Sequence, residues 1–260
     1  MPRSTFYYGS KNKPDKWEVE RQRIIELYHY HKGRYGYRRL TIDMRKEGSF
    51  INEKTVRKLM KEADIKCEVR MKRYRSYKGD VGKIAPNIVE RNFASDKPYQ
   101  KMVTDVTEFS LFGEKVYLSP VLDLFNREVI YYTIYRRPVL EMALDMIKGT
   151  IALIGNTSNS VLHSDQGWQY KHKKYQKLLI SNNIIQSMSR KGNCLDNAVI
   201  ENFFGLLKSE LLYLQKFNSL EHFIAELNDY IWYYNNCRIK KKLNGMTPVQ
   251  YRMHYLEKYL

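Results

Sequence analysis

The chain has 260 residues and carries 45 lysines and arginines against 28 acidic residues, a formal net charge of +17. Its 43% apolar content excludes a wholly disordered chain. No apolar run approaches the roughly 18 residues of a membrane span, and no hydrophobic stretch follows Met1 as a secretory leader requires. The three scattered cysteines (Cys67, Cys194 and Cys237) form no disulfide framework or paired metal knuckle, so we expect a reduced, cytoplasmic protein of one or two domains.

The positive charge is concentrated in the first third of the chain. Residues 1–83 hold 23 basic and 11 acidic residues, a net of +12, whereas residues 84–260 hold 22 and 17, a net of +5. A sequence pI of about 9.6 with this asymmetry favours a polyanionic partner. Nucleic acid is the leading candidate, because a basic amphipathic helix that would anchor the chain on an anionic membrane is not evident.

Three short helices are predicted before residue 65. Apolar residues recur at helical spacing over 17–32 and 37–47, and Asn52 is a good N-cap for a third helix. The outer face of that third helix is basic, with Lys54, Arg57, Lys58 and Lys61. Short helices with a basic third member suit a helix-turn-helix reader of DNA, and a plain helical bundle with a solvated face fits the pattern equally well.

A basic segment without clean periodicity follows over residues 66–83. Its basic residues, which include Arg73 and Arg75, surround Tyr74 and Tyr77. The composition predicts a linker that tracks phosphates and offers tyrosines for stacking, or a solvated hinge.

From about residue 98 the pattern changes to strands. The pattern predicts a three-stranded meander over Lys101–Phe109, Lys115–Phe125 and Glu128–Tyr135. A helix is predicted to begin at Pro138 and to end at about Leu153, with Leu140, Leu144 and Ile147 facing inward. The remaining predicted elements are strands at Ser160–His163 and 184–187, and helices at about 170–180, from about 197, and finally over 220–236. Strands that begin antiparallel and then alternate with helices predict an α/β fold with a mixed five-stranded sheet.

Three carboxylates stand out by position. Asp105 interrupts an apolar strand, Asp165 directly follows another, and Glu201 lies one turn into a helix. Asn197, Gly205 and Lys208 share the helix face of Glu201. Carboxylates that converge repel one another, which raises the pKa of one of them or recruits cations. Ligands that are all oxygen atoms favour Mg²⁺ or Mn²⁺. Two such ions would serve phosphoryl transfer. Asp196 competes with Glu201 for the third position, although it is also placed to cap the helix.

Several motifs resemble one family. Asp165 and Glu201 are separated by 35 residues. The stretches that carry the resemblance are Thr104-Asp105-Val106-Thr107, Leu162-His163-Ser164-Asp165-Gln166-Gly167, Ser187–Ala198, Glu201-Asn202-Phe203-Phe204, Tyr35–Leu40, Tyr233–Arg238 and Thr247–Tyr251. Over nearly its whole length the chain resembles the OrfB-type transposase of the insertion-sequence-three family, in the retroviral-integrase superfamily.

The resemblance implies an RNase H-like core that cleaves and joins DNA at the ends of a mobile element. Asp105, Asp165 and Glu201 would form the catalytic triad and hold two Mg²⁺ or Mn²⁺ ions. The expected domains are a helical DNA-binding module (1–65), a basic linker (66–97), an RNase H-like integrase core (98–215) and a C-terminal helical extension (216–260). The expected DNA contacts are Lys208, Asn197, Lys191, Arg190, Lys54, Arg57, Lys58, Arg38, Arg39, Arg73 and Arg75.

The implied partners are the terminal inverted repeats and target DNA. We expect a homo-oligomer on DNA, associated with the nucleoid and without membrane contact. An upstream-frame helix-turn-helix protein is a further expected partner, acting separately or fused to this chain. The sequence departs from the family at Met102, Trp168, Lys240 and Lys241, none of which belongs to the triad.

Three other functions are weaker. A non-catalytic DNA-binding regulator would not place three acids near phosphates, because they repel DNA. An RNase H-like nuclease for hybrid duplexes would share the triad but would not need the basic N-terminal helices. A tyrosine recombinase needs an arginine-rich catalytic set, which we do not find. A zinc site at His29, His31 and Cys67 lacks paired thiols, and His163 at the end of a buried strand favours a structural role.

Overall fold

The computed structural model describes residues 15–69, 84–155, 159–190 and 194–259. The chain divides into two compact units, Met1–Val69 and Arg70–Leu260. The predicted core (98–215) and the predicted C-terminal extension (216–260) both fall in the second unit. None of the described helices is long and apolar enough to cross a membrane.

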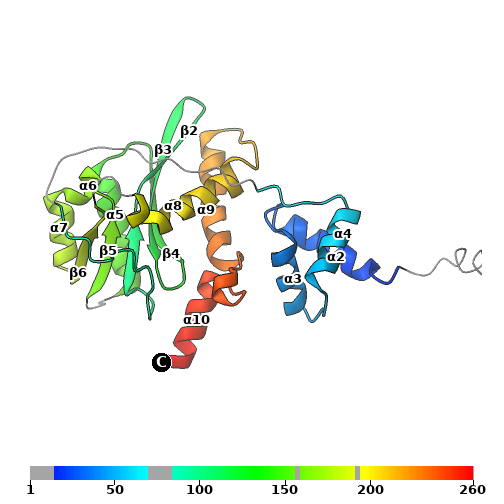
Figure 1. The fold of residues 1–260 in the computed structure, drawn as a ribbon. Coiled ribbons are helices and arrows are strands. Elements are labelled where there is room, and N and C mark those ends of the chain that lie inside the picture. Colours follow the sequence, from blue (N-terminus) through cyan, green and yellow to red (C-terminus); the bar gives the residue numbers. More distant parts are fainter. Residues whose placement is uncertain (1–14, 70–83, 156–158, 191–193, 260) are drawn as a thin grey trace, which may run out of the picture. The chain divides into compact units, whose positions relative to one another are not determined.

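The described part of the first unit holds the three predicted helices, α2 (Glu18–Tyr30), α3 (Tyr37–Lys46) and α4 (Glu53–Glu62) (Figure 1). The Asn52 side chain accepts the Lys54 backbone N–H at 2.9 Å, so Asn52 caps α4 as predicted. Each helix contributes a fully buried residue to a common core: Ile24, Leu40 and Val56. This packing leaves the basic face of α4 exposed.

The second unit is built on a mixed sheet. Its described strands are β1 (Lys101–Thr104), β2 (Thr107–Leu111), β3 (Glu114–Asp123), β4 (Val129–Tyr135), β5 (Ser160–Ser164) and β6 (Ile184–Met188). β3 pairs antiparallel with β1, β2 and β4, whereas β1, β5 and β6 run parallel to one another. The sheet is therefore mixed, as the meander followed by alternating strands and helices predicted.

The strand predicted over Lys101–Phe109 is divided at Asp105 and Val106. β1 pairs with the end of β3, where Thr104 faces Val121. β2 pairs with the beginning of the same strand, where Thr107 faces Leu118. β1 and β2 together thus occupy one position of the predicted five-stranded sheet. The break leaves Asp105 outside the ladder, which frees its side chain from strand packing.

The helices of the second unit are α5 (Leu140–Ile154), α6 (Trp168–Lys171), α7 (Lys173–Ile180), α8 (Ala198–Leu207), α9 (Leu220–Asn236) and α10 (Pro248–Tyr259). α5 packs against β3 and β4, and α8 packs against β1. In Figure 1, α6 and α7 lie on one side of this unit, and α9 and α10 run down the other. A single π-helical turn, Lys208–Leu212, continues directly from α8.

The inward residues predicted for the helix after Pro138 are confirmed only in part. The buried residues of α5 are Met142, Ala143, Met146, Ile147, Thr150 and Ile154. The predicted Leu144 is half-buried against the core cluster, and the predicted Leu140 is half-buried. Of the predicted set only Ile147 is fully buried.

The prediction that the helix over 220–236 is the last one is wrong, because α10 follows. Thr247 and Gln250 form a reciprocal capping box at its start, in which each backbone N–H donates to the other residue's side chain, at 3.1 and 3.2 Å.

One apolar cluster of the second unit includes side chains from β1, β5, α5 and α7. Met102 belongs to it and is fully buried opposite Leu162 in the β1–β5 ladder. Aromatic side chains of α8 and α9 meet elsewhere, where Phe203 packs edge-on against Tyr234 with ring centroids 4.9 Å apart. This close packing holds β1, β5 and α8 in position. The predicted triad residues lie on α8 or directly after β1 and β5.

Candidate active site

Asp105 and Asp165 follow neighbouring parallel strands at the same level. The β1–β5 register pairs Lys101 with Val161 and Val103 with His163. Asp105 directly follows the end of β1, and Asp165 directly follows the end of β5. Because the carboxyl ends of parallel strands meet at one edge of a sheet, both carboxylates lie at the same edge.

The backbone orients both carboxylates. The Val106 N–H donates to Asp105 Oδ1 at 2.7 Å, and the Gly167 N–H donates to Asp165 Oδ1 at 2.8 Å. Both aspartates are half-buried. Each carboxylate therefore has one oxygen bound by the chain.

Glu201 joins these aspartates from α8. It is half-buried in the first turn of that helix, which packs on β1. On the same face, a Cβ added at Gly205 would meet nothing within 4 Å. The α8 face that carries Glu201 is thus open beside Gly205.

The three carboxylates influence one another electrostatically. Burial, then repulsion from Asp165 and Glu201, raises the pKa of Asp105 well above its usual range. Burial also raises the pKa of Asp165, and burial followed by repulsion from Asp165 raises that of Glu201. Such a set is destabilised when fully ionised and gains from a cation.

The donor set fits a hard divalent cation. All three groups offer carboxylate oxygens, the ligands that Mg²⁺ and Mn²⁺ prefer. In the part of the chain that the structure describes, no three acidic, histidine or cysteine residues are gathered into a ready metal cage. Mg²⁺ commonly uses one or two protein carboxylates together with water and substrate phosphate, so an open set of this kind is suited to it.

Asp196 is engaged elsewhere. Its side chain is 0% exposed and accepts hydrogen bonds from Arg190 and Arg91 and from the Asn87 amide, at 2.9 to 3.0 Å. The hydrogen bonds from Arg190 lower the pKa of this carboxyl below its usual range. Asp196 therefore ties the segment before α8 to residues 87–91, which leaves Glu201 as the better-placed third acid.

Two family models described as "Integrase core domain" match the chain, one over residues 95–194 and the other over residues 201–256. A third model, "HTH-like domain", matches residues 16–73. The chain is 51% identical to the putative transposase InsK for insertion sequence element IS150 of Escherichia coli, over 97% of this chain and 90% of that protein. The chain belongs to the IS3 family of transposases, within the integrase superfamily. This superfamily consists of DNA-processing polynucleotidyl transferases.

This transposase is also similar to proteins at lower sequence identity. It is 31% identical to the transposase InsF for insertion sequence IS3A of Escherichia coli, over 88% of this chain and 80% of that one. The catalytic core domain of HTLV-2 integrase in complex with magnesium superposes with a TM-score of 0.51 at 20% identity, covering 61% of this chain and 99% of that one. This likeness shows an RNase H-like fold, and the family match decides for an HTH-like domain over a plain helical bundle at the front.

Lys208 of the transposase lies close to the carboxylates. It is half-buried, and its Nζ lies 5.7 Å from the centroid of the Phe109 ring. Burial lowers its pKa, while the charges of Glu108 and Asp105 oppose that change. Lys208 thus places a cation beside the acidic edge.

The π-helical turn that begins at Lys208 is held by a buried ion pair. Arg238 donates to both oxygens of Glu210 at 2.7 and 2.6 Å, and the Tyr230 hydroxyl donates to one of them at 3.0 Å. Glu210 and Arg238 are almost completely buried. The pair joins the π-helical turn to the end of α9, and this structural use of Arg238 was not foreseen from the sequence.

The other expected DNA contacts lie in different environments. Lys54, Arg57 and Lys58 are exposed on α4, although Lys58 approaches Glu62 at 3.6 Å. Arg190 is paired with Asp196, and Asn197 is buried, with neither side-chain polar atom bonded to any described residue. Lys191, Arg73 and Arg75 lie outside the described residues.

Arg38 and Arg39 lie at the start of α3. The Arg38 guanidinium lies 5.5 Å from the ring centroid of Tyr37, and that of Arg39 lies 5.3 Å from the ring centroid of Tyr35. The tyrosines of the Tyr35–Leu40 motif therefore support these arginine side chains.

Two residues near the carboxylates were not singled out from the sequence. Burial and the charges of Asp105 and Asp165 raise the pKa of the Tyr170 phenol. Burial raises the pKa of Asp165, and the charge of buried Lys171 opposes part of that rise. Their place on the short helix after Asp165 could have suggested them. His163, by contrast, is buried between the Ser187 and Ser189 hydroxyls, at 2.8 and 3.1 Å, which is a structural role.

Proposed function

We propose that this transposase cleaves DNA at the ends of its insertion sequence and joins them to target DNA, with Asp105, Asp165 and Glu201 holding two divalent cations. The observation that carries the proposal is the parallel pairing of β1 with β5, because Asp105 and Asp165 directly follow these two neighbouring strands. Their electrostatic coupling to each other and to Glu201 supports it.

Mg²⁺ is the proposed ion, and Mn²⁺ is expected to replace it. When bound, a pair of such ions activates an attacking oxygen and stabilises a leaving oxygen in phosphoryl transfer. The chain's own contribution is orientation: the Val106 and Gly167 N–H groups hold Asp105 and Asp165 in fixed rotations. The Lys208 cation, beside the same edge, is proposed to hold a phosphate next to the reacting bond.

The proposed partners follow from the front half of the chain. Its HTH-like domain and excess positive charge support recognition of double-stranded DNA, at the terminal inverted repeats, with target DNA as the second substrate. We propose that the chain acts as a homo-oligomer on DNA in the nucleoid. An upstream-frame helix-turn-helix protein, separate or fused, is proposed to take part.

The test is a strand-transfer assay on the element's own terminal repeats. Asp105→Asn, Asp165→Asn and Glu201→Gln should each abolish cleavage and joining, because each keeps the shape of the side chain and removes a charge that holds the ion. Binding of the repeats should stay unchanged or become slightly tighter, because a negative charge near phosphate is removed. Normal strand transfer by any variant would remove that residue from the triad.

The choice of metal gives a second arm. Mg²⁺ and Mn²⁺ should both support joining, whereas Ca²⁺ should support binding without turnover, because its looser coordination positions the oxygens poorly. Strand transfer that continues at full rate in EDTA would overturn the metal-dependent proposal.

A further inference from the structure

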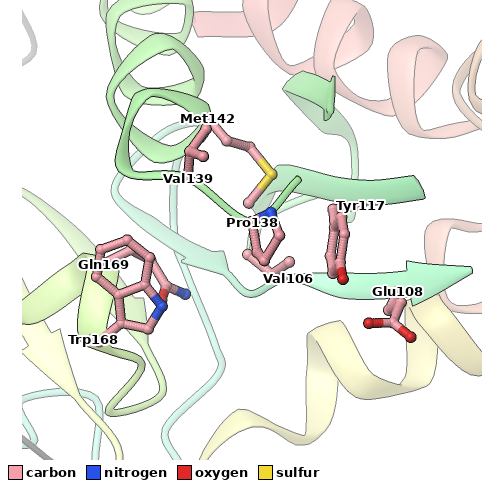
Figure 2. Close-up of a pocket in the computed structure, with 8 residues that line it drawn as sticks. All are labelled: Val106, Glu108, Tyr117, Pro138, Val139, Met142, Trp168 and Gln169. Atoms are coloured by element: carbon pink, nitrogen blue, oxygen red, sulfur yellow. The ribbon is translucent and has the colours of Figure 1, made fainter. Parts of the chain in front are cut away.

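An apolar pocket opens beside the proposed triad. Its volume is about 170 Å³, and its walls come from four parts of the fold. Val106 precedes β2, Tyr117 lies on β3, Pro138 and Met142 lie at the start of α5, and Trp168 with Gln169 lies on α6 (Figure 2). The pocket is not used by the metal-binding carboxylates themselves.

The pocket shares its backbone with the site. Val106, in the pocket wall, is the residue whose N–H binds Asp105. Gly167, whose N–H binds Asp165, is the residue directly before Trp168. A DNA phosphate held at the two carboxylates would therefore bring its neighbouring nucleotides to the mouth of this pocket.

The size and lining of the pocket suit one planar aromatic group. Typical small-molecule sites span roughly 300–1,000 Å³, whereas a cavity of about 150 Å³ holds one benzene ring. Trp168 is 50% exposed, so part of its indole is open to stacking. Figure 2 shows it with Gln169 on one side of the pocket, facing Val106 and Pro138 on the other.

The polar groups at the pocket suit a base. The exposed Glu108 carboxylate, which pairs with Lys115 at 3.1 Å, accepts N–H donors, and the Gln169 amide both donates and accepts. A nucleobase is uncharged, planar and bordered by such donors and acceptors. Base–aromatic stacking tolerates any base, because each presents a π-face.

We propose that this pocket binds one unpaired nucleobase of the DNA strand next to the reacting phosphate, stacked on Trp168. The inference rests on the proposed function, because it places the reacting phosphate at Asp105 and Asp165. Removing a base from its stack is unfavourable. Stacking on Trp168 would offset part of that cost and hold the strand open at the bond to be cut.

The test combines a protein change with a DNA change. Terminal-repeat duplexes carry an abasic site at each position flanking the cleavage point in turn, and their binding is measured in Ca²⁺, which prevents turnover. At one position the abasic site should weaken wild-type binding about tenfold, the expected loss of one stacked base. Trp168→Ala should weaken binding of intact DNA by a similar factor, and the two changes together should cost no more than either alone.

Two variants control the test. Trp168→Phe keeps a ring and should retain most of the coupling. Trp232→Ala removes another exposed tryptophan, on α9 and not in this pocket, and should leave every abasic position as in wild type. Unchanged thermal midpoints would show that Trp168→Ala is folded, as expected for a half-exposed side chain.

The outcome separates this inference from the proposed function. Independent effects of Trp168→Ala and the abasic site at every position would overturn the base pocket, even if the triad variants are inactive. A change of complex stoichiometry in Trp168→Ala without base dependence would overturn it too, because a second copy of the chain would then fill the pocket. Coupling that persists in a strand-transfer-competent Asp105→Asn variant would leave the pocket intact and refute the triad.

Discussion

At the scale of single residues, the buried charge of Asp105 lowers the stability of the fold, although the proposed metal site requires that charge. Burial and two neighbouring carboxylates raise its pKa well above its usual range. The folded protein then retains a proton that the unfolded chain releases at about pH 4. The free energy of unfolding therefore falls as the pH rises from there and through the raised folded pKa.

We predict that Asp105→Asn stabilises the protein in EDTA at pH 8, because the amide keeps the Val106 hydrogen bond without the charge. The thermal midpoint should rise by about 2–4 °C, the shift that 1 kcal/mol gives at this size. The difference from wild type should vanish below about pH 4, where the carboxyl is protonated in both states. Calorimetry at both pH values measures it, and an equal or lower midpoint at pH 8 would be inconsistent with the buried-charge explanation.

Asp145 provides a control of opposite sign. The Tyr135 hydroxyl donates to it at 2.6 Å and lowers its pKa. A lowered folded pKa contributes stability above the unfolded value, and this is lost as the pH falls through the folded one. Asp145→Asn should therefore lower the midpoint at pH 8, in contrast to Asp105→Asn.

Lys208 is predicted to contact a phosphate rather than to maintain the fold. Lys208→Ala should weaken binding to DNA of any sequence and lower the slope of log affinity against log salt by about one. Lys208→Glu should reduce affinity further, because it repels the backbone. Salt titrations of both variants measure this, and an unaltered slope together with full strand transfer in Lys208→Glu would show that the lysine meets no phosphate.

At the scale of elements, the Glu210–Arg238 pair determines the course of the chain after α8. Breaking a buried pair leaves an uncompensated charge and costs about 3–5 kcal/mol. We predict a loss of this size in Arg238→Met, and a clearly smaller loss in the double variant Glu210→Met/Arg238→Met. Urea unfolding compares these two variants and Glu210→Met. A double variant whose loss of stability equals the sum of the two single losses would show that the charges are not coupled.

Local signals made some elements predictable. α9 has the predicted bounds because Ser219 caps its start, accepting the His222 N–H at 3.1 Å, and its apolar residues keep the helical period throughout. Asn52 similarly announced α4. The three acids proposed for the site could be singled out from the sequence because each holds an unusual place in or next to its own element.

Long-range contacts determined what was missed. The Arg91–Asp196 contact joins residues 105 positions apart. Because this partner is so distant in the sequence, Asp196 looked available as an alternative third acid. The π-helical turn depends on Arg238, and nothing in Lys208–Leu212 alone distinguishes it from an α-helix. The pocket beside Trp168 has walls from four distant segments. α10 was a different failure, because the capping box of Thr247 and Gln250 was readable.

At the scale of the whole molecule, recognition and chemistry are predicted to reside in different units. Removing residues 1–83 removes a net charge of +12 and the HTH-like helices. The remaining chain should lose selective binding of the terminal repeats but retain weak metal-dependent nicking of generic DNA. Competition binding at moderate salt measures selectivity, and a truncated chain that still prefers the repeats would place recognition in the second unit.

The proposed activity of the transposase depends most on which carboxylates hold the metal. Mn²⁺ bound to the protein–DNA complex can be counted by electron paramagnetic resonance in wild type, Glu201→Gln and Asp196→Asn. We predict two ions per active site in wild type, a loss of ions in Glu201→Gln, and full binding by Asp196→Asn molecules that remain folded. Full Mn²⁺ binding in Glu201→Gln, with loss in folded Asp196→Asn, would contradict the assignment of Asp105, Asp165 and Glu201 as the triad.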